Sequence, residues 1–96
     1  MRFADLTQRQ LAFFREDHAD LMEACNTAER AYDHAARDEA EARYAEYLEL
    51  VEEGVDALSE IRDAYASTLD QEAAEVYEQA FDREVKRHLP RFGLRL

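Results

Sequence analysis

The chain has 96 residues, enough for one domain, and carries a net charge of −11. Such an acidic body repels nucleic-acid phosphates and anionic lipids, which argues against direct nucleic-acid binding and against membrane association. The single cysteine, Cys25, permits no intramolecular disulfide, and the sequence contains no membrane-length apolar run and no signal peptide, so we expect a cytoplasmic location.

The charge is divided unevenly along the chain. Residues 1–82 carry 7 basic and 22 acidic side chains, a net charge of −15. Residues 83–96 carry five basic side chains and one acidic side chain, a net charge of +4. The sequence therefore combines an acidic body with a basic C-terminal segment.

Turn-forming residues are scarce, with two glycines and one proline, and valine and isoleucine together number five. Alanine, glutamate, arginine and leucine, which favour helices, predominate throughout. No segment shows the alternating pattern of a strand. The composition predicts an all-α fold.

The first helix is expected over residues 5–36, with Thr7 and Gln10 in the spacing of a capping box. Its apolar positions recur every three or four residues, as in a coiled coil. We call this set the first seam: Leu11, Phe14, His18, Leu21, Cys25, Ala28, Tyr32 and Ala35.

The second helix is expected over residues 39–66, after a break near Arg37 and Asp38. The competing interpretation is one unbroken helix from Thr7 to Ala66, about 90 Å long at 1.5 Å per residue. The second seam has the same spacing: Tyr44, Leu48, Val51, Val55, Leu58, Arg62 and Tyr65.

The third helix is expected over residues 69–88, where Ser67 or Thr68 can cap its start and Pro90 and Gly93 follow its end. Residues 90–96 form a basic and apolar tail, interpreted either as a disordered terminus or as a short segment that packs on a partner. Arg87, at the end of the third helix, and Arg91 and Phe92, in the tail, are candidate partner-binding residues.

Together these elements predict one domain over residues 1–89, an antiparallel three-helix bundle with long, coiled-coil-like helices. Leucine, isoleucine, valine and phenylalanine number only 20 of the 96 residues. Because so small a core buries little surface, we expect dimerisation to complete it, as a homodimer with twofold symmetry.

Helical bundles often hold metal ions between Glu-x-x-His motifs, and this sequence contains no such motif. The remaining candidate ligands are His18, His34, Asp38, Glu84 and His88. The segment from Glu16 to Leu21 resembles the first helix of hemerythrin-like proteins, which implies an iron-binding bundle, although the later helices lack that family's further histidines. A metal-binding bundle, hemerythrin-like or ferritin-like and assembled by dimerisation, is the alternative function.

Catalytic motifs are missing from the sequence. Neither serine, Ser59 or Ser67, lies in a Gly-x-Ser-x-Gly elbow, and no glycine-rich phosphate loop occurs. Cys25 lies on the first seam, where it is expected to act as a small apolar residue. The sequence favours a non-catalytic protein without a cofactor.

The second helix carries an acidic stripe opposite its apolar seam. We considered a solvated face, a docking surface for a basic partner, and an imitation of nucleic-acid phosphates. The predicted function is a self-associating protein-interaction or scaffold module, with the stripe as a docking surface. The stripe consists of Glu49, Glu52, Glu53, Asp56, Glu60 and Asp63.

Overall fold

The computed structural model describes residues 2–96, and these residues form five helices and no strand. The all-α prediction is confirmed. The two later helices lie close to their expected bounds, whereas the first expected helix is divided in two and the tail contains a short helix. The helices are α1 (Ala4–Asp17), α2 (Ala19–Asp33), α3 (Ala40–Ala66), α4 (Gln71–His88) and α5 (Pro90–Gly93).

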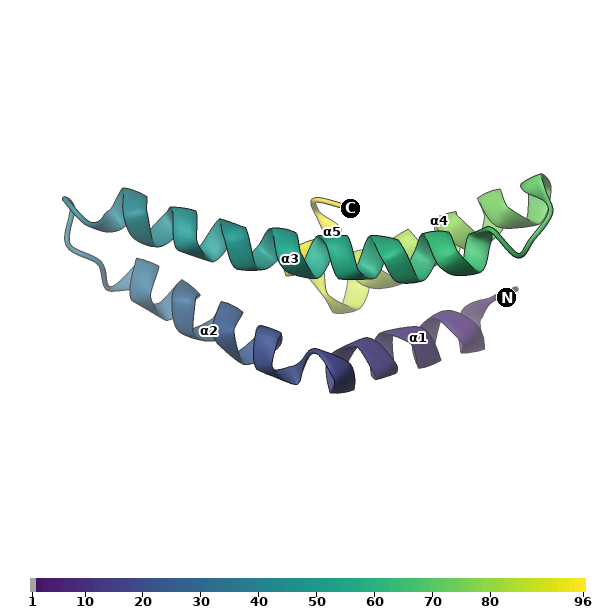
Figure 1. The fold of residues 1–96 in the computed structure, drawn as a ribbon, viewed down its shortest axis with the longest axis horizontal. Coiled ribbons are helices and arrows are strands. Elements are labelled where there is room, and N and C mark those ends of the chain that lie inside the picture. The colour runs from purple at the N-terminus through teal and green to yellow at the C-terminus, as the bar shows by residue number, and fades with distance from the viewer. Residues whose placement is uncertain (1) are drawn as a thin grey trace.

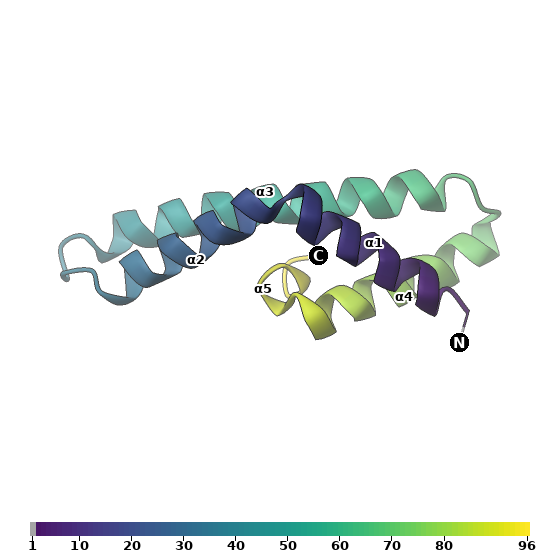
Figure 2. The same ribbon diagram turned by 90° about the horizontal axis from the view of Figure 1, so that it is seen from below.

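Helix α3 is the longest helix, with 27 residues, and runs along most of the length of the molecule (Figure 1). Helix α2 packs beside the half of α3 that begins at Ala40, and α4 packs beside the other half. Helix α1 packs on α4, and α5 folds back against the middle of α3. Seen from below, one end of the molecule therefore consists of α2 and α3 alone (Figure 2).

The unbroken first helix was a wrong prediction, because the chain bends at His18 between α1 and α2. His18 has φ −117° and ψ 31°, outside the helical range, although its N–H still bonds to the Phe14 carbonyl at 2.9 Å. The bend lets α1 follow α4 while α2 follows α3 (Figure 1). Tertiary packing therefore sets it, since neither proline nor glycine is present there.

The turns before the helices also differ from the expected caps. Thr7 lies inside α1, and its hydroxyl donates to the carbonyl oxygens of Phe3 and Ala4. Asp70 caps α4, because its carboxylate accepts the Ala73 N–H at 2.9 Å. Between α2 and α3 the chain turns over residues 34–39, where the sequence placed a break.

The core lies in the half of the molecule where α1, α3 and α4 meet. Tyr77, on α4, is fully buried there with its ring against Tyr65 and Phe81. Its hydroxyl donates to Gln10 Oε1 on α1 at 2.8 Å. The hydroxyl is thus satisfied, and an aromatic ring fills the space between three helices.

The buried hydroxyl of Tyr77 makes stability depend on pH in the alkaline range. Burial raises the pKa of Tyr77 from 10.0 to about 12, against the smaller opposing effect of the Gln10 hydrogen bond. In the unfolded chain the phenol ionises near pH 10, so the unfolded state loses its proton first. The free energy of unfolding therefore falls between about pH 10 and pH 12, by up to about 1.4 kcal/mol per pH unit.

We expect Tyr77→Phe to be less stable than the wild type at pH 8 by about 1 kcal/mol, the contribution of one hydrogen bond. By pH 11 the variant should be at least as stable, because phenylalanine cannot ionise. Urea denaturation of both proteins at pH 8, 10 and 11 measures the difference. A difference that stays constant over this range would contradict the assignment.

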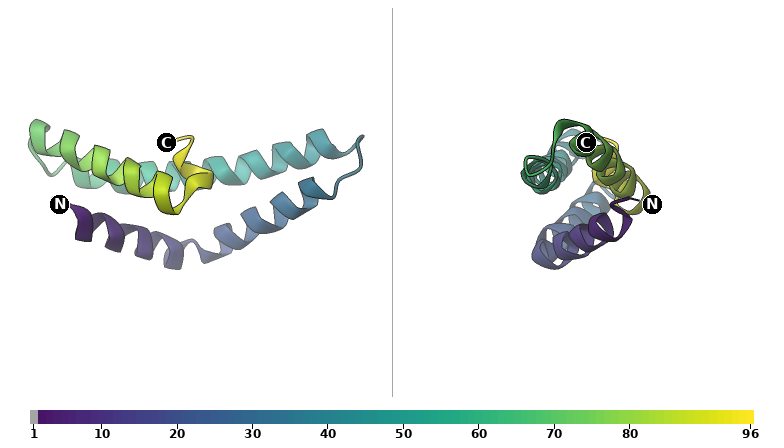
Figure 3. Two further views of the ribbon diagram at one scale, coloured as in Figure 1. Left: turned by 180° about the vertical axis from the view of Figure 1, so that it is seen from behind. Right: turned by 90° about the vertical axis from the view of Figure 1, so that its right-hand side faces the viewer.

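The molecule is elongated, with dimensions of 51 × 22 × 19 Å. Its radius of gyration is 15.3 Å, whereas a compact domain of this length has about 12.5 Å. Of residues 19–50, which we call the hairpin end, only Cys25 is buried. The hairpin end comprises α2, the turn after it and the first part of α3, and it projects beyond α4 and α5 (Figure 3).

Candidate interaction surfaces

The six acidic side chains of the predicted stripe are all exposed on α3, away from its buried residues Val51 and Leu58. Asp63 also contacts the guanidinium of Arg62, which pairs with Asp82 on α4. The other five carboxylates form no ion pair within residues 2–96. The stripe is thus an exposed anionic surface on α3.

Repulsion within the stripe costs helix stability, because like charges three or four residues apart face each other. Asp56 has three such neighbours, Glu52, Glu53 and Glu60. We expect Asp56→Asn to raise the free energy of unfolding by about 0.5–1 kcal/mol in dilute buffer. The gain should shrink in 1 M salt, where the Debye length is about 3 Å.

Urea denaturation at both ionic strengths measures this effect. Glu72→Gln is the control, because Glu72 is an exposed carboxylate in the first turn of α4, where a negative charge favours the helix. Neutralising it should lower stability slightly. If both variants shifted stability in the same direction, repulsion along the stripe would not be the cause.

The predicted tail is part of the folded domain. Phe92 is only 1% exposed, and its ring lies edge-on to Phe14 with centroids 5.9 Å apart. Leu89 is buried as well, and Pro90 begins α5, a position where its missing N–H costs nothing. A disordered tail was therefore the wrong interpretation, and Phe92 is not available to a partner.

Arg91 is likewise turned toward its own chain. Its guanidinium donates to Tyr47 Oη and to Asn26 Oδ1, both at 3.1 Å, and pairs with Glu29 at 3.3 Å. Burial works to lower the pKa of Arg91, but the contacts with Tyr47 and Glu29 outweigh it and raise that pKa. Arg91 thus fastens α5 to α2 and α3. Of the three residues predicted to bind a partner in this region, only Arg87, in the last turn of α4, is exposed.

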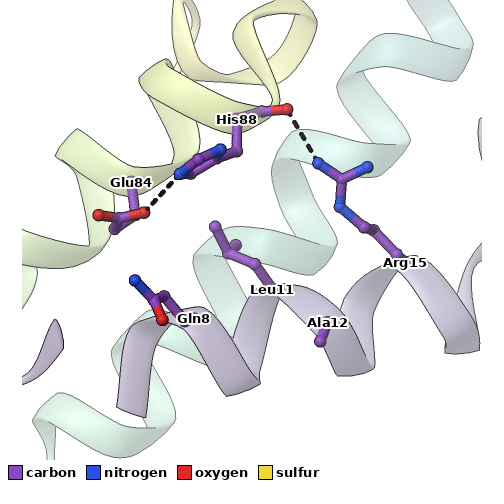
Figure 4. Close-up of a pocket in the computed structure, with 6 residues that line it drawn as sticks. All are labelled: Gln8, Leu11, Ala12, Arg15, Glu84 and His88. Carbon is purple, nitrogen blue, oxygen red and sulfur yellow. Dashed lines mark hydrogen bonds and ion pairs between the residues drawn. The ribbon is translucent and has the colours of Figure 1, made fainter. Parts of the chain in front are cut away.

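A shallow pocket of about 260 Å³ lies between α1 and α4 (Figure 4). His88 Nε2 contacts Glu84 Oε2 at 3.0 Å, and Arg15 donates to the His88 carbonyl oxygen at 3.0 Å. Glu84 Oε2 is buried and makes no well-aligned hydrogen bond. The arrangement ties α1 to the end of α4. Its lining residues are Gln8, Leu11, Ala12, Arg15, Glu84 and His88.

The candidate metal ligands are dispersed apart from this pair. His18 stacks on Phe14 at the bend, with ring centroids 4.8 Å apart, whereas His34 and Asp38 lie exposed in the α2–α3 turn. Over residues 2–96, no three side chains of histidine, cysteine, aspartate or glutamate gather closely enough to hold a metal ion. A metal site built from these residues would require ligands from a second copy.

Cys25 is fully buried between α2 and α3, as its position on the first seam predicted. Burial raises the pKa of its thiol, against the lowering effect of Arg91. The neutral thiol is a poor nucleophile, and its burial keeps reagents from reaching it. Cys25 therefore acts as a packing residue.

The structure reveals one surface that the sequence analysis missed. Tyr32 of α2 and Tyr44 of α3 lie with ring centroids 5.2 Å apart, and Tyr47 lies 6.3 Å from Tyr44. The Tyr47 ring in turn lies under the Arg91 guanidinium at 5.7 Å. Tyr32 and Tyr44 are 40% and 42% exposed. We call these three residues the tyrosine face, which runs from α5 along the hairpin end.

No match is found when the chain is compared with protein families, with curated proteins and with solved structures. In the part of the chain that the structure describes, no helix has the length and apolar character needed to span a bilayer.

Proposed function

We propose that this chain is a non-catalytic helical module that associates with a second copy of itself and offers the acidic stripe of α3 to a basic protein partner. One observation carries the first part. The hairpin end contains a third of the chain but only one buried residue, Cys25. Helices in stable domains bury an apolar face against other elements, whereas the other apolar side chains of this hairpin, Leu21, Met22, Tyr47 and Leu50 among them, are only half-buried within one copy.

The seams support the same proposal. The first seam is buried at Leu11, Phe14 and Cys25 but exposed at Tyr32. The second seam is buried at Val51 and Leu58 but exposed at Tyr44. Both patterns thus extend beyond the part of the molecule that one copy covers, and a second copy would supply the missing contacts.

Surface area supports the proposal quantitatively. The chain exposes 6475 Å², whereas a monomeric protein of its 11.2 kDa mass exposes about 5,700 Å². The excess is about 800 Å², similar to the area that each partner buries in a stable protein interface, about 800 Å².

For the second part of the proposal, the support is electrostatic. The stripe places six exposed carboxylates along one face of α3, and a concentrated field of one sign attracts and orients a partner of opposite charge. Repulsion within the stripe lowers helix stability, and a basic partner bound to the stripe would offset that repulsion.

Light scattering coupled to size exclusion, with elemental analysis of the purified protein, tests the proposal. We expect a metal-free particle of 22.4 kDa, twice the 11.2 kDa of the chain. A particle of 11.2 kDa at every concentration would contradict self-association. Stoichiometric iron, manganese or zinc would instead favour the metal-binding alternative.

A further inference from the structure

The hairpin end lacks the third helix that covers the other half of α3. Helix α4 follows α3 only from its C-terminal end to the middle, where α4 ends at His88 and the chain turns into α5. Seen from behind, α2 and α3 continue alone past α5 (Figure 3). The position that α4 would occupy beside the hairpin end is open.

The tyrosine face marks this open position. Arg91 and Tyr47 lie at its inner end, next to α5, and Tyr44 and Tyr32 continue it outward. Exposed aromatic rings in contact with one another are typical of interface centres, because they bury a large area with little loss of side-chain entropy. The open position is thus lined by side chains suited to an interface.

The charges of the hairpin end select the direction of a second copy. Its tip, residues 30–43, carries Arg30, Arg37 and Arg43 among four acidic residues. Its inner parts, residues 19–29 and 44–50, carry five acidic residues and no basic one. In an antiparallel pair each tip, with a net charge of −1, meets the partner's inner part, with a net charge of −5, so repulsion between the two copies is smaller than in a parallel pair. A parallel pair would bring the two acidic inner parts together.

We propose that a second copy of the chain covers the tyrosine face, with the two hairpin ends packed antiparallel about a twofold axis. This inference rests on the proposed self-association and assigns it a surface and a geometry. Each copy then completes the other, and the two hairpins form a four-helix layer in which Tyr44 and Tyr32 are buried. Apart from Glu49, which belongs to the hairpin end, the acidic stripe lies outside this contact.

Introduction of a negative charge at matched positions tests the surface. Tyr44→Glu places a carboxylate in the proposed contact, and Tyr32→Glu does the same from the neighbouring helix. Val76→Glu is the control, because Val76 is 41% exposed, almost the same as Tyr44 at 42%, but lies near the start of α4. All three positions are exposed helical ones, and circular dichroism checks that helicity is retained.

We expect the control to keep the wild-type mass of 22.4 kDa, twice 11.2 kDa. The two tyrosine variants should dissociate to 11.2 kDa, with a dissociation constant raised about tenfold or more. If both tyrosine variants stayed dimeric, the tyrosine face would not be the contact, although self-association would stand. A monomeric wild type would overturn the proposed function and this inference together.

A spin label at the hairpin tip tests the geometry. Arg37→Cys provides an exposed attachment point, and the buried Cys25 is spared by the reagent. In the antiparallel pair each tip lies beside the partner's inner part, so the two tips are separated by roughly the rise of the chain from residue 37 to residue 50, about 20 Å. Pulsed electron resonance should find this distance. A separation below about 15 Å would show a parallel pair and overturn the antiparallel arrangement.

Discussion

Replacing Phe92 by alanine is expected to lower the free energy of unfolding by about 3–5 kcal/mol. The ring is 1% exposed and packs on Phe14 and on the surface of α3 at Gly54. Its removal leaves a cavity where α5 meets α1 and α3, and those helices can collapse only partly. A domain of this size has about 5–15 kcal/mol of total stability, so the loss is severe.

Urea denaturation monitored by circular dichroism measures the effect. Leu94→Ala is the matched control, because Leu94 is 83% exposed and lies only two residues away. Its change should stay within about 0.5 kcal/mol. A Phe92→Ala variant that lost less than about 1 kcal/mol would show that α5 contributes little to the core.

The second large effect concerns Gly54, the glycine inside α3. Its φ is not positive, so the backbone does not require glycine there. The requirement is space, because a Cβ at this position would clash with the Phe92 ring, which has three carbons within 2.8 Å of it. Gly54→Ala should therefore cost about 1–3 kcal/mol by overpacking, although alanine favours a helix.

In a Phe92→Ala background the same change should have the opposite sign. With the ring removed, the alanine methyl meets open space, and its helix propensity stabilises the variant by about 1 kcal/mol. A double-mutant cycle by urea denaturation measures this coupling. Equal costs of Gly54→Ala in both backgrounds would mean that the glycine is not needed to accommodate Phe92.

These two positions also show what the sequence could predict. The bounds of α3 and α4 were close to those observed because their helical patterns end at recognisable turn segments. Helix α5 was missed because residues 90–96 mix basic and apolar side chains without a periodic pattern. The signal that could have found it was Gly54, since an isolated glycine in a 27-residue helix suggests a close packing partner.

The sequence around His18 contains no glycine or proline that would have indicated the bend. Its neighbours Asp17 and Ala19 fit a helix, and the departure arises because α1 and α2 pack on different partners. The tyrosine face was missed for another reason. The apolar spacing predicts seams that are suited to burial, but spacing alone cannot show which seam residues are buried within one copy and which are exposed.

The acidic stripe was the surface most readily predicted from sequence. Its six residues recur at helical spacing opposite the second seam, and in α3 they are exposed. Exposure of this kind follows from periodicity alone, because residues opposite a buried face point to solvent. Periodicity could not predict the burial of Arg91 and Phe92, because both residues lie beyond the last periodic segment of the sequence.

Hydrogen exchange measured over a range of protein concentrations tests most directly whether a second copy covers the hairpin end. The helical amides of residues 19–50 should exchange more slowly as concentration rises, because association suppresses local opening. Amides of α4 near Val76 should exchange at rates that change less. Exchange at the hairpin end that is fast and independent of concentration would contradict the claim.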